Sequence, residues 1–155
     1  MSDDPEISFS EWTPWSERQL LKRRDGPWLG LYLWGHFEQR PTEAERPYPA
    51  LPKELIYVGE TKHIDVRPLT GEHHRLAHYR DTFTGDMDLK NLYVSVGRLE
   101  QFPKGYAGIE ARAKYRKLRT YTQYLEAKIY WEYTKRWNSP PALHYKKSRK
   151  SSPDS

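Results

Sequence analysis

Apolar runs alternate with polar stretches along the chain and predict three strands. Residues 28–37 (WLGLYLWGHF) form an aromatic-rich run, residues 55–59 (LIYVG) form a shorter one, and residues 92–99 alternate apolar with small or polar side chains. Short runs of this kind, bounded by turn-forming residues, are typical of strands. Segment 38–53 contains four prolines and little apolar pattern. We therefore expect a long loop there.

Three other segments have helical patterns. Thr13-Pro14 is typical of an N-cap followed by proline at the first helical position, so a short helix is expected over residues 15–24. A second helix is predicted from about residue 70 to 83. The third segment, residues 106–137, is helical in composition, and we expect two helices that break near Arg119-Thr120. Its spacing of three and four residues predicts one buried stripe, formed by Leu118, Tyr121, Leu125 and Ile129.

The order of these elements is helix, strand, strand, helix, strand, helix, helix. It predicts an α+β fold with a small three-stranded, mainly antiparallel sheet flanked by helices, plus an extra N-terminal helix. We expect an N-terminal extension and helix over residues 1–27, the main domain over residues 28–145, and a basic disordered tail over residues 146–155. Residues 1–9 are expected to fray.

Composition limits the classes of function. The 155 residues suit one domain, and the absence of cysteine excludes disulfides and thiolate–metal sites. The sequence contains no apolar run of about 18 residues, so no membrane span is expected. The acidic N-terminus lacks the layout of a secretory signal. A cytoplasmic location is therefore expected. A net charge of +5, six tryptophans and twelve tyrosines favour a polyanionic partner such as nucleic acid.

Two short motifs carry the most information, Gly30-Leu31-Tyr32 and Tyr57-Val58-Gly59. Each places a tyrosine beside a glycine within a predicted strand. Such strands can present two phenols on one sheet face while leaving the backbone open to a ligand. Either triplet alone is more often a packing feature. The two triplets together favour a functional site because an ordered series follows them along the chain. This series consists of Arg75, Tyr79, Glu126 and Asn138.

Together these residues resemble the GIY-YIG nuclease family, with Leu31 and Val58 where that family carries isoleucine. The resemblance covers roughly residues 28–145. It implies a DNA endonuclease that hydrolyses phosphodiester bonds, most simply in duplex DNA, with Mg²⁺ or Mn²⁺ as cofactor. The catalytic set implied by the resemblance is Tyr32, Tyr57, Arg75, Tyr79 and Glu126, and the substrate-binding set is Lys62, His78 and Asn138.

The roles within that set follow from the chemistry of phosphodiester hydrolysis. Glu126 would hold the metal ion, and Arg75 would bind phosphate through its fork of donors. Tyr57 is the expected general base, with Tyr32 hydrogen-bonded nearby and Tyr79 orienting water or phosphate. A free phenol ionises near pH 10, so this role requires neighbouring cations or the metal. Asn138 is expected to steady Glu126 or to end its helix.

Several alternatives stay open. Arg67 lies nearer the shorter spacing of the family, although Pro68 biases it away from helix, so it competes with Arg75. His74 and His78 have the spacing of a zinc pair, but Arg75 between them opposes a metal. The chain as a whole is expected to be a compact standalone enzyme, restriction-like or associated with phage or mobile elements. Segment 38–53 and the N-terminal helix would then recognise the target.

Two other classes of protein compete with the nuclease. A catalytically inactive nucleic-acid-binding module would keep the same fold but has no need of a carboxylate facing phosphate. A small basic RNA-binding protein is the third alternative, although the sequence lacks the signatures of the common RNA-binding folds.

Overall fold

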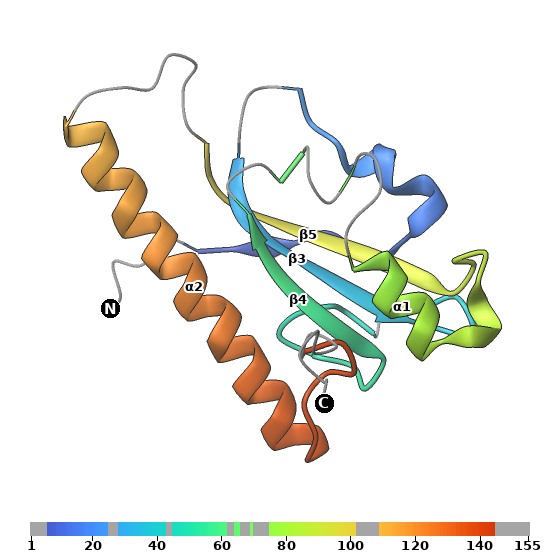
Figure 1. Ribbon diagram of the computed structural model, residues 1–155. Coiled ribbons are helices and arrows are strands. Elements are labelled where there is room, and N and C mark those ends of the chain that lie inside the picture. The colour runs from blue at the N-terminus through green and yellow to red at the C-terminus, as the bar shows by residue number, and fades with distance from the viewer. Residues whose placement is uncertain are drawn as a thin grey trace, which may run out of the picture.

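An antiparallel sheet forms the centre of the computed structural model, which describes residues 6–24, 28–42, 45–61, 64–65, 69, 75–101 and 109–144 (Figure 1). Its three long strands are β3 (Trp28–His36), β4 (Leu55–Thr61) and β5 (Leu92–Gln101). Strand β3 lies in the middle and pairs antiparallel with both of the others. The predicted α+β class and the three predicted strands are confirmed.

The N-terminal segment adds two strands that the sequence did not predict. Strands β1 (Ser8–Phe9) and β2 (Thr13–Pro14) both pair antiparallel with β5, so the sheet has five strands instead of three. The expectation that residues 1–9 fray is therefore wrong for Ser8 and Phe9. These short strands occupy the outer edge of β5 and shield its backbone groups.

The expected N-terminal helix forms as a 3₁₀ helix, η1 (Trp15–Leu21). Thr13 and Pro14 belong to β2, so their predicted role as helix start is wrong. Pro14 has extended backbone angles (φ −55°, ψ 143°), and no side chain caps the helix. Without a cap to hold the first turn, the segment forms only the short, tightly wound helix.

Two α-helices complete the fold. Helix α1 (Leu76–Thr82) is followed by a 3₁₀ turn, η2 (Thr84–Asp86), and α2 (Ile109–Trp137) runs for 29 residues. The predicted break at Arg119-Thr120 is wrong, because α2 contains neither glycine nor proline and Thr120 donates its hydroxyl to the carbonyl of Arg116 within the helix. The predicted stripe is confirmed: Leu118, Leu125 and Ile129 are buried, and Tyr121 is partly buried.

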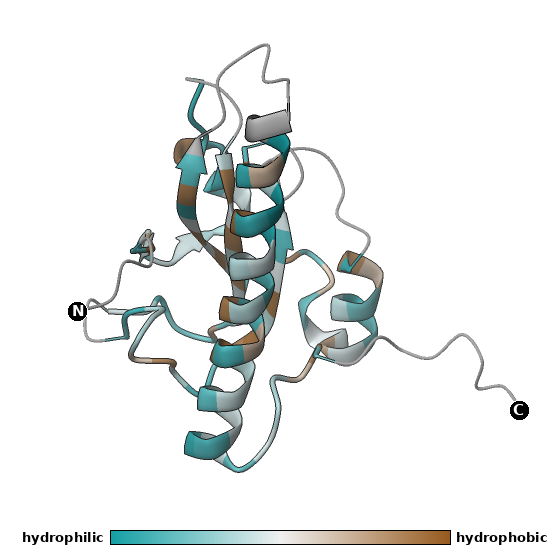
Figure 2. Ribbon diagram, turned by 90° about the vertical axis from the view of Figure 1, so that its left-hand side faces the viewer, coloured by the Kyte–Doolittle hydropathy of each residue, from teal (hydrophilic) through white to brown (hydrophobic). Residues whose placement is uncertain are grey.

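The two faces of the sheet carry separate cores, because side chains alternate along β3. Tyr32 and Trp34 lie in the core that α1 and η1 cover, whereas Leu31 and Leu33 lie in the core that α2 covers. Figure 2 looks onto α2, which lies in front of the sheet. None of the helices in the described part of the chain is both long and apolar enough to cross a bilayer.

The motif glycines are needed for packing. A Cβ at Gly30 would lie 2.0 Å from the carbonyl oxygen of Gly97 on β5, and a Cβ at Gly59 would lie 2.4 Å from the phenol ring of Tyr32. The backbone at these glycines was expected to stay open for a ligand. That expectation is wrong, since the space beside Gly30 and Gly59 is filled by β5 and by Tyr32.

Gly30→Ala should lower the free energy of unfolding by roughly 2–4 kcal/mol, because a methyl group cannot fit against a backbone oxygen and the β3–β5 pairing must shift. Gly85→Ala is the matched control, since no atom lies within 4 Å of the added carbon. Urea denaturation of both variants measures the difference. Equal stability of the two variants would contradict the close approach of β3 and β5.

Candidate functional site at the edge of β4

The tyrosines of the two motifs lie on the same sheet face, as predicted. Tyr32 pairs with Gly59 in the β3–β4 register, and its ring centroid lies 5.9 Å from that of Tyr57. Trp34 is the direct cross-strand partner of Tyr57, and their ring centroids are 5.6 Å apart. Gly59 has no side chain, and this leaves the space in which the Tyr32 ring lies. The paired motifs therefore build a continuous aromatic row.

Arg75 precedes α1 and lies over this row. Its guanidinium carbon is 4.8 Å from the ring centroid of Tyr57, and its side chain is only 6% exposed. The Nη1 atom of Arg75 donates to the carbonyl oxygen of Leu143 at 3.1 Å and lies 3.2 Å from Nδ1 of His78. Arg75 is thus a buried cation held against a phenol, and the choice between Arg75 and Arg67 stays a prediction. Arg67 lies outside the described residues.

Tyr79 is placed differently from its neighbours. Its side chain is fully buried, and its hydroxyl donates to Oδ2 of Asp86 at 2.6 Å and lies 2.8 Å from Nδ1 of His36. Burial and the bond to Asp86 raise the pKa of Tyr79 above its ordinary value. The same carboxylate accepts the backbone N–H groups of Lys90 and Asn91. The Tyr79 hydroxyl therefore joins the turn after α1 to His36 at the end of β3.

The outer edge of β4 is closed by residues from the C-terminal part of the chain. The N–H of Leu143 donates to the carbonyl of Ile56 at 2.8 Å. The hydroxyl of Tyr130 on α2 donates to the carbonyl of Val58 at 2.9 Å. His144 packs edge-on against Tyr130, with ring centroids 3.8 Å apart. Side chains from both faces of the sheet meet at this edge.

Glu126 lies on the same flank of α2, one turn before Tyr130. Burial, and then repulsion from Glu60, raise the pKa of Glu126 to about 7, while Arg119 acts to lower it. Glu60 is itself bound by Arg119, with two N···O distances of 2.8 Å. Within the described ranges no hydrogen bond or ion pair joins Glu126 to another side chain. Its half-buried carboxylate is therefore available to a cation.

Glu126 and the paired tyrosines belong to opposite faces of the sheet, because Tyr32 and Tyr57 lie in the core under α1 and α2 covers the other core. Tyr130 is their shared neighbour. Burial raises the pKa of Tyr130 most, Tyr57 and Glu126 raise it further, and the Val58 bond and Arg75 lower it. Tyr57, Arg75 and Glu126 therefore all act on one hydroxyl group. The contacts of the hydroxyl itself are with the backbone of Val58, and no described hydrogen bond or ion pair joins Glu126 to Tyr32 or Tyr57.

The remaining predicted residues are more scattered. His78 is partly buried beside Arg75. Asn138 is exposed and ends α2 in the left-handed conformation (φ 61°), with its N–H bonded to the carbonyl of Thr134. It lies about 18 Å along the helix from Glu126, so the expectation that it steadies that carboxylate is wrong. Lys62 and His74 lie outside the described residues.

Sequence reasoning missed four residues at this edge, Glu60, Arg119, Tyr130 and His144. One signal was present: Tyr130 follows Glu126 by four positions, so the two share a helix face. Glu60 follows the second motif directly. The position of His144 carries no local signal, because it depends on the chain turning back along β4 after α2.

A single-carboxylate site agrees with the metal chemistry that Glu126 allows. In the described part of the chain, no three His, Asp or Glu side chains gather to hold an ion. Mg²⁺ commonly binds through one or two carboxylates and completes its shell with water and substrate phosphate oxygens. Glu126 fits this arrangement because its oxygens are partly shielded from water and carry no described donor.

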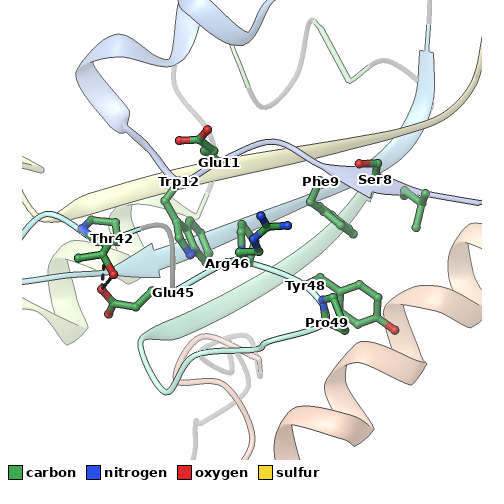
Figure 3. A pocket seen from close by; sticks show the side chains of 12 residues that line it. Ser8, Phe9, Glu11, Trp12, Thr42, Glu45, Arg46, Tyr48 and Pro49 are labelled. Atoms are coloured by element: carbon green, nitrogen blue, oxygen red, sulfur yellow. Dashed lines mark hydrogen bonds between the residues drawn. The ribbon is translucent and has the colours of Figure 1, made fainter.

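A separate pocket of about 490 Å³ lies on the sheet face that α2 covers (Figure 3). The N-terminal segment and the 38–53 loop form its walls, with Phe9, Trp12 and Tyr48 supplying rings. In Figure 3 the guanidinium of Arg46 is seen between the side chains of Trp12 and Phe9. Arg46 is exposed, and no hydrogen bond or ion pair joins it to another described residue.

Glu126→Gln should change how stability depends on pH. The folded pKa of about 7 is above the ordinary value of 4.5 for a free glutamate, so the folded state holds a proton that the unfolded state has lost. The wild type therefore loses stability as pH rises from about 4.5 to 7. Glutamine cannot ionise, so the variant should gain on the order of 1–3 kcal/mol relative to wild type between pH 5 and pH 8. Urea denaturation at both values measures it, with Glu17→Gln, an exposed residue of η1, as control. Parallel pH profiles for wild type and Glu126→Gln would contradict the buried environment.

Comparisons with known proteins were made by family profile, by curated sequence and by solved structure. None of the three finds a match to this chain.

Proposed function

We propose that this protein is a metal-dependent endonuclease of the GIY-YIG type that hydrolyses phosphodiester bonds in DNA. The observation that carries the proposal is the direct pairing of the two motifs. Tyr32 lies across Gly59 and beside Tyr57, and Arg75 stands over the second phenol. Packing alone explains the glycines. It does not require a buried guanidinium over a phenol or a half-buried carboxylate at the same strand edge.

Arg75 and Tyr57 form the first half of the proposed mechanism. A scissile phosphate entering at the β4 edge would accept hydrogen bonds from Arg75, which would offset the charge that develops on its oxygens. Tyr57 would take the proton of the attacking water. The guanidinium carbon of Arg75 lies 4.8 Å from the Tyr57 ring centroid, so one phosphate could meet both groups.

Glu126 forms the second half. A bound Mg²⁺ or Mn²⁺ would polarise the phosphate and favour departure of the leaving oxygen. Glu126 is the residue that would hold it, and the ion would displace the proton that the carboxyl group retains near pH 7. Glu60 cannot share this task without breaking its two contacts with Arg119. In this proposal Glu126 supplies the carboxylate ligand from α2, and Arg75 binds the phosphate from the start of α1.

The second candidate, a catalytically inactive nucleic-acid-binding module, is favoured by one observation. Tyr57 is 8% exposed and Arg75 is 6% exposed. A substrate can therefore reach either group only if the residues that bury them move aside. An inactive module needs no such opening. Cleavage assays separate the two functions.

Tyr57→Phe should lower the cleavage rate by roughly 10²–10⁴-fold, the usual contribution of a positioned general base, because it removes one oxygen and keeps the ring. Cleavage of supercoiled plasmid, with Mg²⁺ or Mn²⁺ and with chelator, measures both the rate and the metal requirement. Tyr93→Phe is the control, since Tyr93 is equally buried but lies in the core under α2.

Cleavage by wild type only in the presence of the metal would support the proposal. DNA binding without cleavage under every metal condition would favour the inactive module. Cleavage by Tyr57→Phe at the wild-type rate, with chemistry limiting, would remove Tyr57 as the base.

Arg46→Ala should weaken DNA binding several-fold, because the guanidinium at the pocket forms no hydrogen bond or ion pair with another described residue. The slope of log K against log[salt] should become shallower by the amount expected for one phosphate contact, about 0.9. The rate of cleavage at saturating DNA should stay at the wild-type value. Fluorescence anisotropy at several salt concentrations measures the slope. An unchanged slope would show that the 38–53 loop does not contact phosphate through Arg46.

A further inference from the structure

One flank of α2 carries large aromatic rings that are exposed to solvent. Tyr124 is 55% exposed and Trp131 is 60% exposed. They are seven residues apart, so they lie on the same side of the helix two turns from each other. Exposed rings of this size are unusual on a helix whose buried side already has Leu125 and Ile129 to fill the core.

Lysines lie on the same flank. Lys117, Lys128 and Lys135 are at helical spacing from Tyr124 and Trp131, and Lys117 and Lys135 are exposed. The ammonium of Lys135 lies 5.5 Å from the ring centroid of Trp131. We call these five residues the α2 stripe. From first to last member it extends about 27 Å along the helix.

The α2 stripe contains no carboxylate. The acidic residue nearest to it, Glu132, accepts a hydrogen bond from the Tyr48 hydroxyl at 3.1 Å, and Glu126 lies on the opposite flank. Over its whole length α2 holds eight lysines and arginines against three glutamates. The stripe therefore combines flat apolar rings with lysines that form no ion pair within the described part of the chain.

We propose that the α2 stripe binds an unpaired strand of DNA, with bases stacked on Tyr124 and Trp131 and phosphates bound by the lysines. The identity of the ligand as DNA rests on the proposed function. Alternating rings and cations match the repeat of base and phosphate in a single strand. In a duplex the ring faces of the bases are hidden within the stack, so stacking on side chains requires unpaired bases.

A second copy of this chain fits the stripe poorly. Two stripes placed face to face would bring lysines of one copy against lysines of the other without an acidic partner. A polyanion carries the complementary charge along its whole length. Charge complementarity thus favours nucleic acid over self-association.

The test measures binding of a fluorescein-labelled oligothymidine of about 12 nucleotides, and of a hairpin duplex of equal charge, by anisotropy in chelator. Wild type should prefer the single strand. Tyr124→Ala and Trp131→Ala should each weaken single-strand binding by roughly fivefold to a hundredfold, with little effect on the duplex, and Trp131→Phe should restore part of it. Lys117→Ala and Lys135→Ala should each reduce the salt slope by about 0.7.

Two control variants lie on the other side of the sheet, near η2. Met87→Ala removes an apolar side chain that is 56% exposed, and Lys90→Ala removes an exposed lysine. Both should bind like wild type. Equal single-strand affinity in Trp131→Ala and wild type would overturn the inference, as would dimerisation that Trp131→Ala abolishes.

The assay contains no divalent ion and detects no cleavage, so its outcome is separate from that of the plasmid assay. Stripe-dependent binding by a protein that never cuts DNA would remove the nuclease proposal and keep the stripe. If Tyr124→Ala and Trp131→Ala change neither cleavage nor single-strand binding, the nuclease proposal stands and the proposed role of the α2 stripe is removed.

Discussion

Hydrogen bonding of β3 along both of its edges is the constraint on which the rest of the structure depends. A strand paired on both sides has no freedom in register, so each side chain of β3 is assigned to one face. Tyr32 and Trp34 must enter one core, and Leu31 and Leu33 must enter the other. The close approach of β3 to β5 is possible only because Gly30 has no side chain.

The second organising feature is the closure of the sheet at β4. Its outer backbone groups would be exposed if nothing covered them, and unpaired edges invite pairing with other chains. Leu143 and the Tyr130 hydroxyl cover this edge at Ile56 and Val58. The same closure gathers polar groups from both faces. Arg75 binds the carbonyl of Leu143, and Glu126 lies one helical turn from Tyr130, so residues that protect this edge also contact the candidate site.

The sequence allowed the long elements to be predicted, because apolar periodicity records burial directly. Strands β3, β4 and β5 and the buried stripe of α2 were found in this way. Two-residue strands such as β1 and β2 have no period to detect, since their pairing is determined by the edge of β5. The break expected in α2 was wrong because a Thr120 hydroxyl can bond within the helix. Leu143 and His144 are positioned by tertiary contacts alone, so local patterns held no information about them.

Closure of the β4 edge also sets an order of events during synthesis on the ribosome. The acceptor of Arg75, the carbonyl of Leu143, is translated 68 residues after its donor. At ordinary elongation rates this interval is about 3–14 s. A nascent chain that already contains both tyrosine motifs and Arg75 still lacks the contact that fixes the guanidinium. Under the proposed function, the growing polypeptide therefore cannot assemble a complete catalytic centre until almost all of the domain has left the ribosome.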